Sequence, residues 1–118
     1  MTKTFTVFLT TPPFAHQNSY TVLRLVEAAL EKGYPVNLFA SADGVHNFTT
    51  GQRASGLPEI GSAFEQLVQK GLHVELCGSC LGLRGIGRED VLPGSNLSSM
   101  KRLFGLIKNS DVFITLGT

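Results

Sequence analysis

The sequence predicts a three-layer α/β/α domain with a mainly parallel sheet of four to five strands. Three observations favour this fold class. Short apolar segments rich in β-forming residues alternate with amphipathic helical patterns, short connections join them, and the apolar segments look buried on both faces. The chain has 118 residues, 42% of them hydrophobic, which suffices for one compact domain over residues 1–118 and leaves no room for a second.

Four segments rich in β-branched and aromatic residues predict the strands. They cover residues 5–10, 35–40, 72–76 and 111–115. The first ends at Pro12 and Pro13, the second runs into a polar loop at 41–44, and the third leads directly to two cysteines. The stretch 78–96 has the glycine-rich composition of a loop and has room for a fifth, short strand.

Helical spacing of apolar residues predicts the helices between these strands. They cover residues 22–30, 60–68 and 100–107, with room for a further short helix over 45–49. Gly33 and Gly71 stand where the first two helices end, because glycine adopts the left-handed conformation that follows a helix at little cost. Strands that alternate with helices in this way form a parallel sheet with helices on both faces.

The composition excludes several classes of function. Ten Lys and Arg against nine Asp and Glu give a net charge of +1, too balanced for a protein that binds nucleic acid through its phosphates. No apolar stretch approaches the roughly 20 residues of a membrane span, and the N-terminus lacks the apolar core of a signal peptide. Two cysteines three positions apart do not make a disulfide framework, so a reducing, cytoplasmic setting is expected.

The charge content also bears on assembly. Only 16% of the residues are charged, against roughly 25% in an average soluble domain. A small chain so poor in charge is compatible with an oligomer that hides part of its surface, which composition alone does not establish.

In parallel α/β sheets, ligands and chemistry lie beyond the carboxyl ends of the strands. Cys77 and Cys80 fall at such an end. Gly78 and Ser79 separate them, and Arg84 follows seven residues after the first cysteine. A thiol reacts as its thiolate, so it needs a lowered pKa and access to solvent. The outward N–H groups of a glycine-rich loop and the permanent charge of Arg84 favour an anion there.

Several kinds of cysteine site match this segment to different degrees. A thioredoxin-like disulfide exchanger has a C-x-x-C motif at a helix start, but glycines break the segment after Cys80. A low-molecular-weight phosphatase has five residues between cysteine and arginine, whereas six separate Cys77 from Arg84. A zinc site needs four ligands and the histidines here are scattered, so no metal or other cofactor is expected. A nucleophilic cysteine that carries sulfur as a persulfide needs no metal, and two small residues packed behind a strand are the simplest alternative.

Further residues at strand ends are candidates for the lining of the same pocket. They are His16, Asn18, Asp43, His46, Gly78, Ser79 and Gly85. Among them, His46 is the candidate for a proton donor or acceptor near the thiolate. The alternative for each is an ordinary polar or small residue in a surface loop.

Residues 74–86, with the sequence VELCGSCLGLRGI, resemble the corresponding segment of the DsrE/DsrF-like (DsrEFH, Tus-type) sulfur-relay family. The order of the elements and the loop 42–47, ADGVHN, are similar as well, so the resemblance covers nearly the whole chain. It implies an α/β/α fold assembled into trimers or hexamers. It also implies a cysteine that accepts sulfur as a persulfide from a donor protein and passes it to a partner, in tRNA thiolation or sulfur oxidation. Cys77 matches the position of that cysteine.

The second cysteine departs from the Tus-type pattern, which has a single cysteine in this loop. A chain with both Cys77 and Cys80 is similar to a homohexameric C-x-x-C branch of the same family. We therefore expect a sulfur carrier in which Cys77 accepts the sulfur and Arg84 stabilises the anion. Cys80 would either resolve the persulfide into a disulfide, with release of sulfide, or be a bystander. Its partners would be sulfur-donor and sulfur-acceptor proteins. Two other functions stay open: an oligomeric protein that binds a small anion or a partner without transfer, and a redox switch based on a Cys77–Cys80 disulfide.

Overall fold

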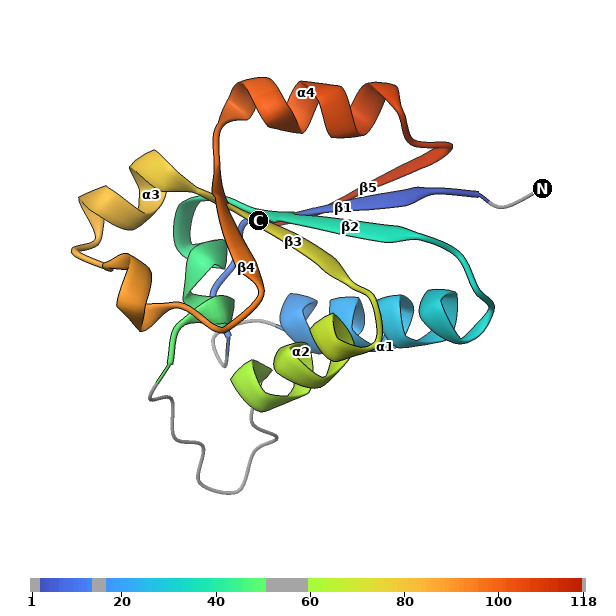
Figure 1. Ribbon diagram of the computed structural model, residues 1–118, viewed down its shortest axis with the longest axis horizontal. Helices are drawn as coiled ribbons and strands as arrows, with labels where there is room; N and C mark the ends of the chain where they lie inside the picture. Colours follow the sequence, from blue (N-terminus) through green and yellow to red (C-terminus); the bar gives the residue numbers. More distant parts are fainter. Residues whose placement is uncertain (1–2, 14–16, 51–59, 118) are drawn as a thin grey trace.

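Five parallel strands form the central sheet, in the spatial order β4-β3-β2-β1-β5 (Figure 1). The computed structural model describes residues 3–13, 17–50 and 60–117. The strands are β1 (Phe5–Leu9), β2 (Val36–Ala40), β3 (His73–Cys77), β4 (Ser95–Ser98) and β5 (Val112–Leu116). The predicted parallel sheet is confirmed, and its fifth strand is β4, which lies at one edge at the end of the glycine-rich stretch.

Helices cover both faces of this sheet, as the sequence predicts. Helices α1 (Asn18–Glu31) and α2 (Ile60–Gln69) lie side by side on one face, and α4 (Met100–Lys108) lies on the other (Figure 1). Three short helices follow strands β2 and β3: the 3-10 helix η1 (Ala42–Phe48), α3 (Gly78–Leu83) and the 3-10 helix η2 (Arg88–Asp90). None of the helices in the described ranges is long and apolar enough to span a membrane.

Helix α3 is the main difference from the sequence-based expectation, which placed a loop after Cys77. Glycines at positions 78 and 82 lower the helix propensity of this segment. Two contacts stabilise the helix nevertheless. The Cys80 N–H donates to Cys77 Sγ at 3.4 Å, which caps the first turn. Leu81 is buried in the larger of the two hydrophobic cores described below. Tertiary packing therefore outweighs propensity here.

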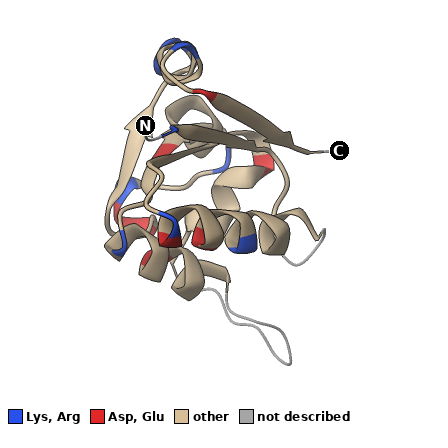
Figure 2. Cartoon of the chain, turned by 90° about the vertical axis from the view of Figure 1, so that its right-hand side faces the viewer, with Lys and Arg blue, Asp and Glu red and all other residues tan. Residues whose placement is uncertain are grey.

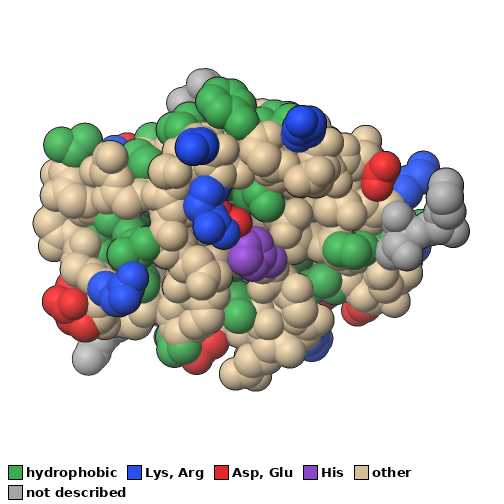
Figure 3. All heavy atoms as spheres, turned by 45° about the horizontal axis from the view of Figure 1, so that its top comes forward, with side chains coloured by type: hydrophobic (Ala, Val, Ile, Leu, Met, Phe, Trp, Pro, Cys, Tyr) green, Lys and Arg blue, Asp and Glu red, His purple; other side chains and the backbone are tan. Residues whose placement is uncertain are grey.

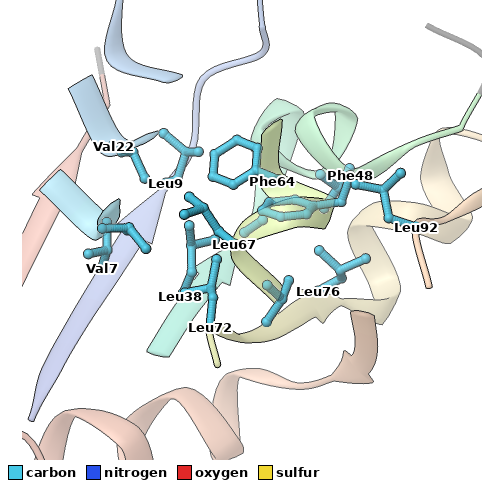
Figure 4. Packing of buried hydrophobic residues seen from close by; sticks show 14 of the residues in the cluster. Val7, Leu9, Val22, Leu38, Phe48, Phe64, Leu67, Leu72, Leu76 and Leu92 are labelled. Atoms are coloured by element: carbon cyan, nitrogen blue, oxygen red, sulfur yellow. The ribbon is translucent and has the colours of Figure 1, made fainter. Parts of the chain in front are cut away.

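The larger core lies between the sheet and helices α1 and α2. Side chains alternate along a strand, so every second residue faces this side. The pairing of Phe48 with Phe64, whose ring centroids are 4.6 Å apart, lies at its centre. Figure 4 shows these rings packed among aliphatic residues from the strands and helices, including Leu9, Leu38, Leu67 and Leu76.

A smaller core lies on the opposite face, under α4. Phe39 of β2 is fully buried and stacks on Phe8 of β1, with ring centroids 6.1 Å apart. Leu103 of α4 and Cys77 of β3 complete the buried part of this cluster. Because side chains alternate along β3, Cys77 shares the α4 face with Glu75, while Leu76 between them faces the larger core.

Candidate functional site

The two cysteines lie together where β3 passes into α3. Cys77 is the last residue of the strand, and Cys80 lies in the first turn of the helix. Both thiols are free. The Cys80 N–H donates to Cys77 Sγ at 3.4 Å. The C-x-x-C spacing thus becomes one turn of helix with two adjoining sulfur atoms.

Cys77 is the more deeply buried of the pair. Only 6% of its surface is exposed, and it packs against Phe39 and Leu103 in the smaller core. Burial raises the pKa of the Cys77 thiol, and the neighbouring Cys80 side chain raises it further; the hydrogen bond from the Cys80 N–H acts in the opposite direction but is weaker. Cys77 is therefore held mainly as the neutral thiol.

Cys80 has a more polar environment and is half-buried. The Ala42 N–H donates to Cys80 Sγ at 3.2 Å, and the Ser41 hydroxyl lies 3.5 Å from the same sulfur. Burial alone would raise the pKa of this thiol. The neighbouring Cys77 side chain, the hydrogen bonds with Ser41 and Ala42, and the positive charge of Arg84 together outweigh the effect of burial, so the pKa of Cys80 is lowered. Cys80 is thus the thiol of the pair that ionises more readily.

Arg84 joins the end of α3 to the turn after β2. Its Nε donates to Asp43 Oδ1 at 2.9 Å, and its Nη1 donates to the backbone carbonyl of Cys80 at 3.1 Å. These bonds hold the guanidinium beside Cys80, where its charge favours the thiolate. The structure thus brings three of the predicted site residues together: Cys80, Arg84 and Asp43.

Ser41 and Ala42 belong to the site but were not among the sequence-based candidates. They form the turn between β2 and η1, and β2 is the neighbour of β3 in the sheet. Ala42 adopts a φ of 50°, a left-handed conformation that is uncommon for residues other than glycine. The only sequence signal for these two residues is their position at the carboxyl end of a strand.

The other candidate residues have different surroundings. Gly78 and Ser79 belong to the cysteine turn itself, and Gly85 ends α3 with a φ of 67°. Asn18 lies at the start of α1, where its side chain donates to Thr11 Oγ1 at 3.1 Å and to the Gly117 carbonyl at 3.3 Å. His46 lies in η1, and His16 is outside the described residues. Within the described ranges, no group of three or more His, Cys, Asp or Glu side chains is placed to hold a metal ion.

A buried carboxylate lies on the same face of β3, two residues before Cys77. Glu75 is the only Asp, Glu, Lys or Arg residue in the described strands. The other charged residues of the described chain lie on helices and loops (Figure 2). The Glu75 side chain is 2% exposed and bonds Ser98, Arg102 (3.0 Å) and His73 (2.7 Å). Burial alone would raise the pKa of Glu75, but these hydrogen bonds and the Arg102 charge outweigh it and lower the pKa. This cluster ties β3 to β4 and α4 beside the cysteine pair.

Replacing this carboxylate by an amide is expected to destabilise the protein in a pH-dependent way. Because the pKa of Glu75 is lowered on folding, its contribution is present above the ordinary value of 4.5 and is lost as the pH falls through the folded pKa. We expect Glu75→Gln to reduce the free energy of unfolding by about 1–3 kcal/mol at neutral pH, and the difference from wild type to shrink below pH 4.5. Urea unfolding at several pH values measures this, with Glu31→Gln at the end of α1 as the exposed control. A deficit that stays constant with pH would contradict the prediction.

The fold and the site together define the class of this protein. It is an α/β/α protein with an all-parallel sheet and a pair of free thiols at the carboxyl end of an inner strand. The chain belongs to the DsrE/DsrF-like family, whose family model matches residues 3–116. The resemblance seen in the sequence is thereby confirmed.

Two relatives of this chain match it over most of its length. It is 32% identical over 111 residues to the uncharacterised protein MJ0989 of Methanocaldococcus jannaschii, covering 94% of this chain and 97% of that protein. It is 34% identical over 106 residues to the uncharacterised protein MK0008 of Methanopyrus kandleri, covering 90% and 88%.

Two solved structures share the fold. The ychN protein from E. coli is 24% identical, with a TM-score of 0.91 and coverage of 98% of this chain and 100% of that chain. MTH1491 from Methanobacterium thermoautotrophicum, described as a protein of unknown function, is 13% identical, with a TM-score of 0.81 and coverage of 97% and 99%. The family membership suggests a role in sulfur relay.

Proposed function

We propose that the protein is a sulfur carrier that accepts sulfur from a donor protein, holds it as a persulfide on Cys77 and passes it to an acceptor protein. One observation carries this proposal. Two free thiols lie next to each other at the carboxyl end of the sheet in a DsrE/DsrF-like fold, and the Ser41 hydroxyl and the Ala42 N–H, which suit a sulfur anion, lie beside Cys80. The family membership favours tRNA thiolation or sulfur oxidation as the setting, in a reducing compartment such as the cytoplasm.

The transfer needs no oxidant, reductant or cofactor. A thiolate of the site attacks the outer sulfur of the donor persulfide. A new sulfur–sulfur bond forms on the carrier, the bond between the two sulfurs of the donor breaks, and the donor leaves as a thiolate that takes up a proton from water. The role proposed for Arg84 is to stabilise the anionic sulfur before and after transfer through its charge.

Assembly into a homo-oligomer, a trimer or a hexamer, is part of the proposal. Among the residues that the structure describes, five large hydrophobic side chains are exposed, namely Leu83, Leu97, Met100, Phe104 and Phe113. Figure 3, which turns the α4 side forward, shows hydrophobic side chains at several places on that surface. Apolar surface of this kind supports contacts between copies of the chain.

Loading with sulfur tests the proposed function directly. The reduced protein is incubated with cysteine persulfide, and its intact mass is measured. We expect wild type to gain one sulfur atom that dithiothreitol removes, and the double variant Cys77→Ser/Cys80→Ser to gain none. A wild-type protein that gains no sulfur would overturn the proposal.

A dithiol redox switch is the second candidate function, favoured by two free thiols within one turn of helix, where the Cys80 N–H bonds Cys77 Sγ. In this case mild oxidation would join Cys77 and Cys80 in a reversible disulfide without uptake of sulfur. Thiol counting before and after oxidation, together with the intact mass, separates the two functions, because a disulfide lowers the thiol count and adds no sulfur.

A further inference from the structure

We propose that sulfur enters the protein at Cys80, where the Ser41 hydroxyl and the Ala42 N–H bind the sulfur anion, and that Cys77 then takes the sulfur from Cys80. This inference rests on the proposed function and assigns different roles to the two cysteines. It also adds two positioning residues, Ser41 and Ala42, from the turn after β2, which lies outside the cysteine motif.

Access distinguishes the two thiols. A donor must bring its outer sulfur into line with the attacking sulfur, so the first thiol to react has to be reachable from outside. Cys80 is half-buried, whereas Cys77 is 6% exposed and lies against Phe39 and Leu103 under α4. A donor therefore meets Cys80 first.

The turn after β2 is built to direct two donors at Cys80. The Ser41 N–H bonds the Leu9 carbonyl at 3.0 Å, and the Gly44 N–H bonds the Ser41 carbonyl at 2.9 Å, so both ends of the turn are fixed. Between them, the left-handed conformation of Ala42 places its N–H 3.2 Å from Cys80 Sγ. Unusual backbone conformations of this kind persist where the surroundings enforce them, frequently at functional sites. Fixed donors stabilise an anion without reorganisation when it forms.

The direction of the second step follows from the different surroundings of the thiols. The thiolate of Cys77, formed by loss of its proton to water, attacks the outer sulfur of the Cys80 persulfide. The new sulfur–sulfur bond forms on Cys77, the bond at Cys80 breaks, and Cys80 leaves as a thiolate bound again by Ser41 and Ala42. A more basic thiol is the better nucleophile and a more acidic one the better leaving group, so sulfur moves from Cys80 to Cys77. The smaller core then shields it from water.

Single-cysteine variants test the entry point by rapid quenching and intact mass after mixing with cysteine persulfide. We expect Cys77→Ser to gain sulfur at the wild-type rate but to lose it quickly to added dithiothreitol, because the sulfur stays on the exposed thiol. We expect Cys80→Ser to gain sulfur at least about tenfold more slowly. A Cys80→Ser variant that loads as fast as wild type, or a Cys77→Ser variant that does not load, would overturn this inference while the carrier function stands. Failure of wild type to load would instead remove the proposed function.

The role of Ser41 has a separate readout. In a Cys77→Ser background, the rate of iodoacetamide alkylation as a function of pH reports the ionisation of Cys80. We expect Ser41→Ala to move this profile to higher pH, Ser41→Thr to keep it near its original position, and Thr21→Ala, which removes an exposed hydroxyl on α1, to leave it unchanged. A profile that Ser41→Ala does not move would show that the hydroxyl does not position the anion.

Discussion

Replacing Gly44 by alanine is expected to destabilise the protein by about 3 kcal/mol or more. Gly44 is buried in η1, and a Cβ atom at this position would overlap the Leu9 carbonyl and lie 3.1 Å from the Thr10 Cα. These are backbone atoms at the end of β1. They cannot move away without disturbing the β1–β2 pairing and the bond from the Ser41 N–H to the Leu9 carbonyl. The strain therefore remains in the folded protein.

The same substitution should also affect the cysteine site, because Gly44 fixes the turn that holds Ser41 and Ala42 against Cys80. Urea unfolding measures the loss of stability, and the pH profile of Cys80 alkylation measures the displacement of the turn. Gly105→Ala in α4 is the matched control: nothing lies within 4 Å of its added Cβ, and alanine in an exposed helix should stabilise by about 0.5–1 kcal/mol. A Gly44→Ala protein as stable as wild type would show that η1 can shift away from β1.

The fold was predictable because its strands carry a strong local signal. The strands β1, β2, β3 and β5 are short runs rich in apolar and β-branched residues. This composition is expected of the inner strands β1, β2 and β3, which are covered on both faces, whereas β5 has it although it lies at an edge and none of its residues is fully buried. Strand β4 has the sequence Ser-Asn-Leu-Ser and lies at an edge, so neither hydrophobicity nor alternation marks its bounds. Helix α3 was missed for a different reason: its glycines oppose a helix, and the burial of Leu81 that favours it is a tertiary contact.

Most of the site that could be predicted lies within one segment; Asp43, from the loop after β2, was a candidate because of its position at a strand end. Cys77, Cys80 and Arg84 are seven residues apart at most, and their position after a strand indicated chemistry. Ser41 and Ala42 reach Cys80 only because β2 and β3 are neighbours in the sheet. The sequence of the cysteine segment carries no information about this strand order. The difference between the two thiols was hidden likewise, since it arises from tertiary contacts: Cys77 packs in the smaller core, whereas Cys80 meets the turn after β2.

The contacts of Phe39 determine how well Cys77 is shielded, and Phe39→Ala is expected to remove both stability and shielding. Truncation of a fully buried phenylalanine costs about 3–5 kcal/mol, from lost burial and from the cavity that remains. This cavity would border Cys77, because both side chains belong to the cluster under α4. In a Cys80→Ser background, we therefore expect Cys77 to react faster with a thiol reagent such as dithionitrobenzoate, under conditions where the protein stays folded.

Matched variants separate local access from global unfolding. Phe39→Leu keeps most of the volume beside Cys77, so it should cost less stability and leave Cys77 slow to react. Phe113→Ala removes a phenylalanine that is already 41% exposed on β5, and it should change neither stability nor reactivity by much. If Cys77 reacted equally fast in Phe39→Ala, Phe39→Leu and the unaltered Cys80→Ser protein, Phe39 would not be its shield. If its reactivity instead followed the unfolding equilibrium in every variant, reagents would reach Cys77 only through global opening, and sulfur held there would be released only when α4 or its neighbours move.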